Sequence, residues 1–451
     1  MAEGTFSFAA TFLSLLEDKK YPTIRDIMTT MNAVDIAMLF DEMDDERIPL
    51  LFRLLPKELA AEVFVEMDDD SQELLIRGFS DAELKAVVDE LYVDDAVDIV
   101  EEMPANVVKR ILKQADPEMR KMINNILQYP DDSAGSIMTT EYVSLRPEMT
   151  VEDAIKRIRR NVVEKETIYT CYVTDKNRTL IGMISLKELL IAEDDTIIED
   201  IMETNVICVD TLTDQEEVAQ MFNKYNFMAL PVVDKETRLV GIVTFDDAID
   251  VMEEETTEDI EKMAAIVPSD KPYLRTGVFE TWKQRIPWLL ILMISATFTS
   301  MIITSFENAL AAQVVLTAFI PMLMDTGGNS GSQAAVTIIR GISLGEIEFR
   351  DIFRIIWKEF RVALLCGSVL ALANFLKLLF IDRIGIYVAA VVCITLLLSV
   401  IIAKIVGSTL PLLAKKIGFD PAVMASPFIT TIVDALSLVV YFKIATILLG
   451  I

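Results

Sequence analysis

Long apolar segments are confined to the last third of the chain. Residues 286–304 and 384–403 contain no charged residue, and each has about the length that a membrane-spanning helix needs. Three further stretches are nearly as apolar: residues 308–324 hold no charge, and residues 362–381 and 421–442 hold a single charge each, Lys377 and Asp434. Five such stretches in succession predict an all-α transmembrane domain over residues 281–451. We place its five helices at about 286–305, 308–326, 360–381, 384–412 and 420–448.

The first 130 residues show a different pattern, in which short amphipathic helices alternate with acidic turns. The segment LFDEMDDE around Met43 returns as FVEMDDD around Met67, and Pro56 and Pro104 stand where new helices would begin. Repeats of this kind are typical of a solenoid, in which each unit buries its apolar face on the next. We therefore predict an acidic, superhelical α-helical domain over residues 1–130. Its acidic turns are equally consistent with solvated helix starts and with metal sites.

A repeat of about sixty residues follows, between positions 137 and 255. Each copy predicts a strand, a helix, two strands joined by a polar turn and a final helix, with Gly182 and Gly241 at matching places. This pattern resembles a tandem pair of α+β CBS domains, at residues 131–200 and 201–250. Such pairs are regulatory modules; some hold an adenine nucleotide such as ATP between the copies, and others are purely structural. The resemblance implies a candidate nucleotide cleft near Tyr169, Val206, Phe227, Pro231 and Asp250.

An acidic stripe continues beyond the second copy, in the sequence DDAIDVMEEETTEDIEK. Steps of three and four residues place Asp247, Asp250, Glu254, Glu258 and Glu261 on one helical face, with Glu255 and Asp259 on the neighbouring stripe. Like charges at this spacing repel, and a divalent cation shared with a second acidic surface would relieve the repulsion; Mg²⁺ and Ca²⁺ both favour carboxylate oxygen. We predict an acidic connecting helix over residues 251–280, facing Asp94 and Asp95. A solvated linker helix is the alternative.

The charge of the chain is divided as unevenly as its hydropathy. The formal net charge is −29, and the residues from Thr281 onward carry 13 basic and 9 acidic side chains, so residues 1–280 carry −33. So acidic a surface attracts cations and repels nucleic acid. The chain has no histidine, which excludes histidine zinc sites and leaves metal binding to oxygen ligands. It also has no GxxxxGK[ST] motif and no histidine that could act as a catalytic base, so we do not expect an enzyme.

Lysine and arginine placement predicts the orientation in the membrane. Basic residues precede the first span and fill the loops between the second and third and between the fourth and fifth spans. The opposite loops hold only Glu307 and the pair Asp382–Arg383. By the positive-inside rule, the soluble part is cytoplasmic and the C-terminus lies outside a cell membrane crossed several times. The first 20 residues lack the features of a cleavable signal, and the four cysteines, without CxxC spacing, fit a reducing compartment.

Two features of the apolar region carry chemistry. Asp434 lies near the middle of its span, where a carboxylate costs a few kcal/mol and is normally kept for an ion path or a buried partner. The stretch PMLMDTGGNSGSQ begins at Pro321 and ends at Gln333; Gly328 and Gly331 permit non-helical backbone and close helix contact there, and Asn329 adds a polar side chain. Such a stretch is tolerated at membrane depth only where it is buried in protein or lines water.

Taken together, the modules and motifs resemble the MgtE family of magnesium channels and transporters. The likeness covers nearly the whole chain: the acidic helical domain, the CBS pair ahead of the membrane domain, the connecting helix, the stretch from Pro321 to Gln333 and the aspartate of the fifth span. It implies a homodimer in the lipid bilayer, with a pore lined by the second and fifth spans. In that pore, Asp434 would meet the ion, Asp420 would lie at the cytoplasmic end, and Asn329 with its neighbouring glycines would lie near the inner gate. Cytoplasmic sensing of Mg²⁺ would fall to Asp247, Glu255, Glu258 and Asp259, with Asp94 and Asp95 as further candidates.

This resemblance and the charge distribution together predict Mg²⁺ uptake gated by cytosolic Mg²⁺. Ions that bridge the acidic parts at high Mg²⁺ would hold the pore shut, and mutual repulsion at low Mg²⁺ would loosen it. Two alternatives stay open. One is a transporter of another divalent cation such as Co²⁺ or Mn²⁺, and the other is a membrane-tethered, nucleotide-sensing CBS regulator that transports nothing.

Overall fold

The computed structural model describes residues 8–162, 165–269, 273, 276–424 and 426–450. The chain divides into two compact units, Met1–Met252 and Glu253–Ile451. Each unit has its own apolar clusters of buried side chains. The boundary falls within one helix, α15 (Phe245–Met263).

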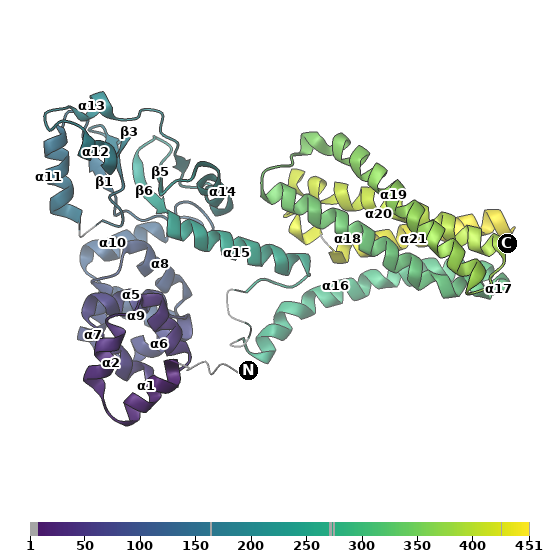
Figure 1. The fold of residues 1–451 in the computed structure, drawn as a ribbon, viewed down its shortest axis with the longest axis horizontal. Coiled ribbons are helices and arrows are strands. Elements are labelled where there is room, and N and C mark those ends of the chain that lie inside the picture. Colours follow the sequence, from purple (N-terminus) through teal and green to yellow (C-terminus); the bar gives the residue numbers. More distant parts are fainter. Residues whose placement is uncertain (1–7, 163–164, 270–272, 274–275, 425, 451) are drawn as a thin grey trace, which may run out of the picture. The chain divides into compact units, whose positions relative to one another are not determined.

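Short helices build the first part of unit one, shown in purple and blue in Figure 1. Several begin at the polar residues that the acidic turns supply: Asp68 accepts a hydrogen bond from the Ser71 amide (3.2 Å), and Ser80 forms a capping box with Glu83. Their apolar faces form one core, in which the Phe52 and Phe79 rings lie 5.3 Å apart. The predicted helical domain is confirmed. Its helices are α1 (Phe8–Glu17), α2 (Tyr21–Met28), α3 (Ala33–Asp41), α4 (Ile48–Phe52), α5 (Lys57–Val65), α6 (Asp69–Gly78), α7 (Asp81–Val88), α8 (Val93–Glu102), α9 (Ala105–Gln114) and α10 (Pro117–Ile126).

The predicted repeat is confirmed as two matching α+β modules. Each has a three-stranded sheet, in which the first two strands are parallel and the last two antiparallel. The first module comprises β1 (Val143–Leu145), α11 (Val151–Asn161), β2 (Thr170–Thr174), β3 (Leu180–Ser185), α12 (Leu186–Ile191) and α13 (Ile198–Ile201). The second comprises β4 (Val209–Asp210), α14 (Gln215–Tyr225), β5 (Ala229–Val233), β6 (Leu239–Thr244) and α15.

The two matching glycines let each module receive a segment of the other. A side chain at Gly241 on β6 would stand 2.5 Å from the sulfur of Met138, and one at Gly182 on β3 would stand 2.6 Å from that of Met202. The same side chains would stand 2.8 Å from the Thr139 carbonyl oxygen and 3.1 Å from that of Glu203, so glycine lets two backbone segments approach closely at both places. The segment ahead of each module therefore lies on the third strand of the other one.

The connecting helix is shorter than predicted and starts earlier. It is continuous with the last helix of the second module and ends at Met263, rather than extending over residues 251–280. Ala265 follows with a positive φ of 56°, and Pro268 cannot continue a helix because it lacks an amide hydrogen. Residues 270–272 and 274–275 of the predicted range lie outside the described residues.

Five long helices make up most of unit two, shown in green and yellow in Figure 1. Within the described residues, four stretches are long and apolar enough to cross a membrane: Val278–Ser305, Phe349–Phe380, Ile386–Lys416 and Ala422–Leu449. The fifth long helix, α18, is too polar to qualify. The elements are α16 (Val278–Ser305), α17 (Glu307–Ala312), η2 (Val314–Phe319), α18 (Ile320–Ser343), η3 (Phe349–Asp351), α19 (Ile352–Phe380), α20 (Ile386–Lys416), η4 (Ala422–Met424) and α21 (Ser426–Leu449).

The predicted second span, residues 308–326, is wrong in its bounds. This stretch contains the short α17, the 3₁₀ helix η2 and only the first turns of α18. Pro321 is the reason, because its fixed φ and missing amide hydrogen suit the first turn of a helix and not its interior. Gly328 and Gly331, which would permit non-helical backbone, both lie inside α18.

Candidate ion-path and metal-binding sites

The glycines of α18 bring this helix against its neighbours. A Cβ at Gly331 would stand 2.6 Å from Ile429 of α21 and 3.2 Å from the Ala403 carbonyl oxygen of α20, and one at Gly407 would stand 2.2 Å from the Gly331 carbonyl oxygen. Gly328 lies in the same way against Thr430. The part of the prediction that concerned close helix contact is thus confirmed.

The opposite face of α18 is polar and exposed. Side chains at steps of four residues are all exposed, while the glycine face between them is buried: Pro321, Asp325, Asn329, Gln333 and Thr337. In a helix, steps of four keep residues on one face. An exposed polar stripe among apolar helices needs water or another protein surface beside it. The stripe explains why α18 is too polar to count as an ordinary span.

Asp434 lies on α21 beside the glycine face of α18. Its neighbours in the sequence, Val433 and Ser437, stand 3.0 and 3.2 Å from the position of a Cβ at Gly327, which fixes the level of Asp434 along α18. Asp434 is half-buried, and its Oδ1 atom is buried without a hydrogen-bond partner in the described residues. The hydroxyl oxygens of Ser437 and of Ser399 on α20 are also buried without a hydrogen-bond partner in the described residues. Buried oxygens without partners indicate a missing donor, water or ion.

Two charged features of unit two were not predicted from the sequence. Asp325 of the polar stripe is near enough to Asp434 for their charges to interact. Lys404 of α20 is buried and pairs with Glu359 of α19, with 3.9 Å between Nζ and Oε2. The signal for Asp325 was its four-residue step to Asn329. The Lys404 pair had no such signal, because the two residues are far apart in the chain.

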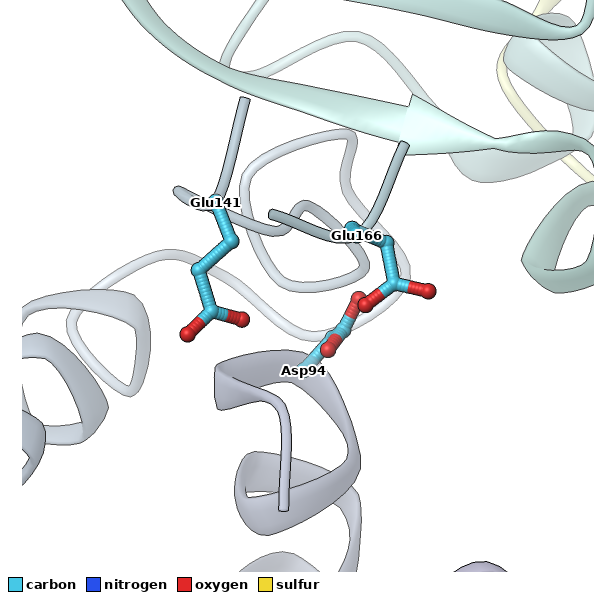
Figure 2. A group of neighbouring side chains, drawn as sticks. All are labelled: Asp94, Glu141 and Glu166. Carbon is cyan, nitrogen blue, oxygen red and sulfur yellow. The ribbon is translucent and has the colours of Figure 1, made fainter. Parts of the chain in front are cut away.

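Unit one holds a cluster of carboxylates where α8 meets the first module. Asp94, Glu141 and Glu166 have carboxylate oxygens that all lie within 4.8 Å of one another. Figure 2 shows the Asp94 and Glu166 carboxylates facing each other, with Glu141 to one side. Asp94 is only 6% exposed, although it is ionisable. Glu141 accepts a hydrogen bond from the Val93 amide (3.2 Å), so it also caps the N-terminal end of α8.

Negative charge prevails in this cluster, although the charge of Lys165 acts on Glu141. Burial, followed by the charge of Asp247, raises the pKa of Asp94 well above its ordinary value and that of Asp95 to about 7. Burial, followed by the charge of Asp95, raises the pKa of Glu166 to about 8. Burial raises the pKa of Asp247 itself to about 6, against the effect of its hydrogen bonds from Thr244. Within the described residues, no lysine or arginine forms an ion pair with these four carboxylates.

This geometry suits a divalent cation. Octahedral Mg²⁺ holds oxygen ligands at about 2.1 Å, and therefore about 3 to 4 Å from one another, so oxygens within 4.8 Å need only a small adjustment. The predicted candidates Asp94, Asp95 and Asp247 are thus brought together. Glu141 and Glu166 were missed, because no sequence pattern ties these two positions to the acidic helices.

The other predicted acidic candidates lie elsewhere. Asp250 is exposed on α15 and raises the pKa of Glu66, after the larger effect of burial. Glu254 is exposed and Glu255 half-buried on the same helix. Glu258 and Asp259 lie in unit two, where Asp259 accepts a hydrogen bond from Ser343 at the end of α18 (3.0 Å).

The predicted nucleotide cleft is realised only in part. A cavity of about 620 Å³ is lined by four aliphatic side chains, a tyrosine, a serine and a lysine: Tyr169, Ser185, Leu186, Lys187, Leu190, Ile191 and Met228. Tyr169 alone of the five predicted residues lines it. Phe227 stacks on Tyr225 instead, with ring centroids 5.3 Å apart, and Pro231 is buried in β5 opposite Ile242. Val206 is half-buried and Asp250 exposed.

Acidic helices, a CBS pair and a bundle of apolar helices around a polar one define a polytopic membrane protein with a large part outside the apolar bundle. Comparison with known families agrees, segment by segment. Residues 31–132 match the MgtE intracellular N domain, residues 134–195 and 198–254 match CBS domains, and residues 320–444 match a divalent cation transporter domain named MgtE. The chain belongs to the MgtE family.

Relatives match over almost the full length. The magnesium transporter MgtE of Thermus thermophilus is 36% identical over 445 residues, which cover 98% of each chain. That of Bacillus subtilis is 33% identical over 433 residues, covering 96% of this chain and 95% of the relative. Unit one resembles the crystal structure of the cytosolic domain of the Mg²⁺ channel MgtE in complex with ATP, with a TM-score of 0.52 and 36% identity over 54% of this chain and 100% of that one.

Proposed function

We propose that this protein carries Mg²⁺ into the cell as a homodimer, along a path formed by α18 and α21. The observation that carries the proposal is Asp434, a half-buried carboxylate in an apolar helix, with one oxygen that has no partner in the described residues. Relatives that match nearly the whole chain are magnesium transporters. A two-fold axis beside the exposed stripe of α18 would place two copies of Asp434 on one aqueous path.

Paired carboxylates suit the chemistry of Mg²⁺. This ion gives up its water reluctantly, so a path for it should hold the hydrated ion through hydrogen bonds instead of stripping its shell. Asp434 and Asp325 supply charge, and Asn329, which is exposed on α18, supplies a polar group that water can reach. The membrane potential favours entry by about 2.3 kcal/mol per charge per 100 mV, so no ATP hydrolysis is needed. Co²⁺ and Mn²⁺ are the alternative cargo.

Cytosolic Mg²⁺ would close this path. In our proposal, ions bind the cluster of Asp94, Glu141 and Glu166 together with Asp95 and Asp247, and further ions bind along α15. Their binding compacts the acidic part and strengthens the hold of α15 on the cytoplasmic end of the path. The distribution of lysine and arginine supports a cytoplasmic unit one and a C-terminus outside a cell membrane.

Flux into liposomes tests the transport proposal. Wild type should admit Mg²⁺, measured with an internal fluorescent indicator, and both Asp434→Asn and Asp434→Ala should abolish the entry. Asp382→Asn, in an exposed loop pair with Lys377 (3.0 Å), is the matched control and should behave as wild type. Equal entry in all four proteins would remove Asp434 from the path. No entry in wild type at any internal Mg²⁺ would favour the membrane-tethered regulator.

The cavity beside Tyr169 favours ATP as a second, regulatory ligand. Its apolar lining suits an adenine ring, and Lys187 supplies a charge for phosphate. A structure with which unit one aligns was solved with ATP. Calorimetric titration should show ATP binding to wild type that is at least roughly tenfold weaker in Lys187→Ala and Tyr169→Ala. Lys235→Ala, an exposed lysine in the turn of the second module, is the control. Unchanged binding in the first two variants would place the nucleotide elsewhere.

A further inference from the structure

The end of α15 carries a lysine that lies between two carboxylates. Lys262 Nζ is 2.5 Å from Glu258 Oε1, one turn earlier on the helix, and 2.7 Å from Asp420 Oδ2 in the segment before α21. All three side chains are partly shielded, with 22% of the lysine, 38% of Glu258 and 33% of Asp420 exposed. We call this group the Lys262 latch.

The latch is supported by packing on both sides. Met263, the next residue, lies against a buried cluster that contains Ala335 and Ile339 of α18, together with Ala422. Asp420 is held by its second oxygen, which accepts a hydrogen bond from the Ala422 amide (2.7 Å). Burial lowers the pKa of Lys262, but the hydrogen bonds to Asp420 and Glu258 outweigh it and raise the pKa overall. The ammonium is therefore charged at any physiological pH.

We infer that Lys262 is an intramolecular cation, which fastens the connecting helix to the start of the last span in the absence of a divalent ion. Glu258 and Asp420 are carboxylates of the kind that Mg²⁺ takes, and the ammonium already occupies the space between them. A divalent ion can bind both only by displacing it. The inference rests on the proposed function in one respect. If cytosolic Mg²⁺ closes the path, Lys262 sets the Mg²⁺ concentration at which the ion replaces the ammonium between Glu258 and Asp420.

The chemistry favours a tether of moderate strength. Ion pairs between partly exposed side chains are individually weak, so the two pairs hold the end of the helix without fixing it permanently. The lysine thus keeps the helix docked most of the time, and Mg²⁺ can replace it. Without the lysine, two uncompensated carboxylates would repel each other and bind Mg²⁺ more tightly.

Hydrogen exchange of residues 253–263 in the full-length protein tests the latch without any measurement of transport. In wild type freed of divalent ions, this segment should exchange slowly. In Lys262→Met it should exchange about five- to thirtyfold faster, and added Mg²⁺ should restore the protection. Lys156→Met removes a matched helical pair elsewhere, Lys156 with Glu152 at 2.7 Å, and should leave residues 253–263 unchanged.

A charge exchange separates the latch from a general loss of packing. The double variant Lys262→Glu with Asp420→Lys restores opposite charges across the same contact and should return slow exchange, whereas Lys262→Glu alone should be fast. Wild-type exchange in Lys262→Met, or fast exchange in the double variant, would overturn the inference. Because the readout is independent of flux, a protein that shows this pattern but moves no Mg²⁺ would refute only the proposed transport.

Discussion

The carboxylate cluster of unit one and the Lys262 latch of unit two use the same chemical group in opposite ways. In the cluster, Asp94, Glu141 and Glu166 come together with no ion-paired lysine or arginine among the described residues. In the latch, an ammonium lies between the two carboxylates. The first arrangement needs protons or metal ions to be stable, and the second carries its own counter-ion. How strongly an acidic surface responds to Mg²⁺ therefore depends on the nearest lysine more than on the number of acids.

The membrane helices also contain an ammonium paired with a carboxylate, Lys404 with Glu359, and breaking this pair should have the largest effect of any substitution on stability. Lys404→Met leaves Glu359 buried without a counter-charge, which should cost about 3 to 5 kcal/mol of stability. The double variant Lys404→Met with Glu359→Gln should recover most of the loss, as measured by thermal unfolding in detergent. Additive losses in the double variant would show that the two residues do not act as a pair.

In the carboxylate cluster of unit one, removing a charge should raise the stability of the protein instead of lowering it. Asp94→Asn should raise stability in the absence of divalent ions, on the order of 2 kcal/mol, because it relieves repulsion at a buried position. It should also abolish most of the stabilisation that Mg²⁺ brings to wild type. Calorimetry with and without Mg²⁺ measures both effects, and Asp195→Asn in an exposed loop is the control. Lower stability of Asp94→Asn without Mg²⁺ would contradict the repulsion.

The ion path offers another test of this comparison. Asp325 and Asp434 lie near each other there, and no lysine among the described residues forms an ion pair with either. Asp325→Asn should slow Mg²⁺ entry about tenfold, less than Asp434→Asn, because Asp325 is exposed on α18 and contributes its charge from a distance. Liposome flux measures the difference. Entry at the wild-type rate would restrict the path to the Asp434 side of α18.

A dependence of stability on pH gives a separate test of the cluster, because its carboxylates have raised pKa values. The folded-state pKa values of Asp95, Glu166 and Asp247, about 7, 8 and 6, lie above the unfolded value near 4. The folded state thus holds more protons between these values, and without metal its stability should fall as pH rises from about 5 to 8. Bound Mg²⁺ should flatten the slope. A metal-free midpoint of unfolding that rises with pH over this range would contradict the assigned pKa shifts.

Module order and element types were predictable from the sequence, because hydrophobic periodicity and repeats are local signals. The bounds of the second span were not, because Pro321 at the first turn of a helix and Pro321 inside a span look alike without tertiary contacts. Asp434 was predictable as a lone charge in an apolar run. Glu141, Glu166 and Lys404 were not, because their significance comes from neighbours far away in the chain.

The exchange of segments at Gly182 and Gly241 bears on how such a protein can be divided. Thr139, ahead of the first CBS module, exchanges two backbone hydrogen bonds with Ile242 in the second (2.8 and 2.9 Å), and Glu203 does the same with Met183 in the first (2.8 and 2.9 Å). Neither module alone contains the segment that completes its own sheet edge. Gene rearrangements can therefore move this pair between proteins only as an intact cassette, and a deletion that halves it would leave an open edge prone to aggregation.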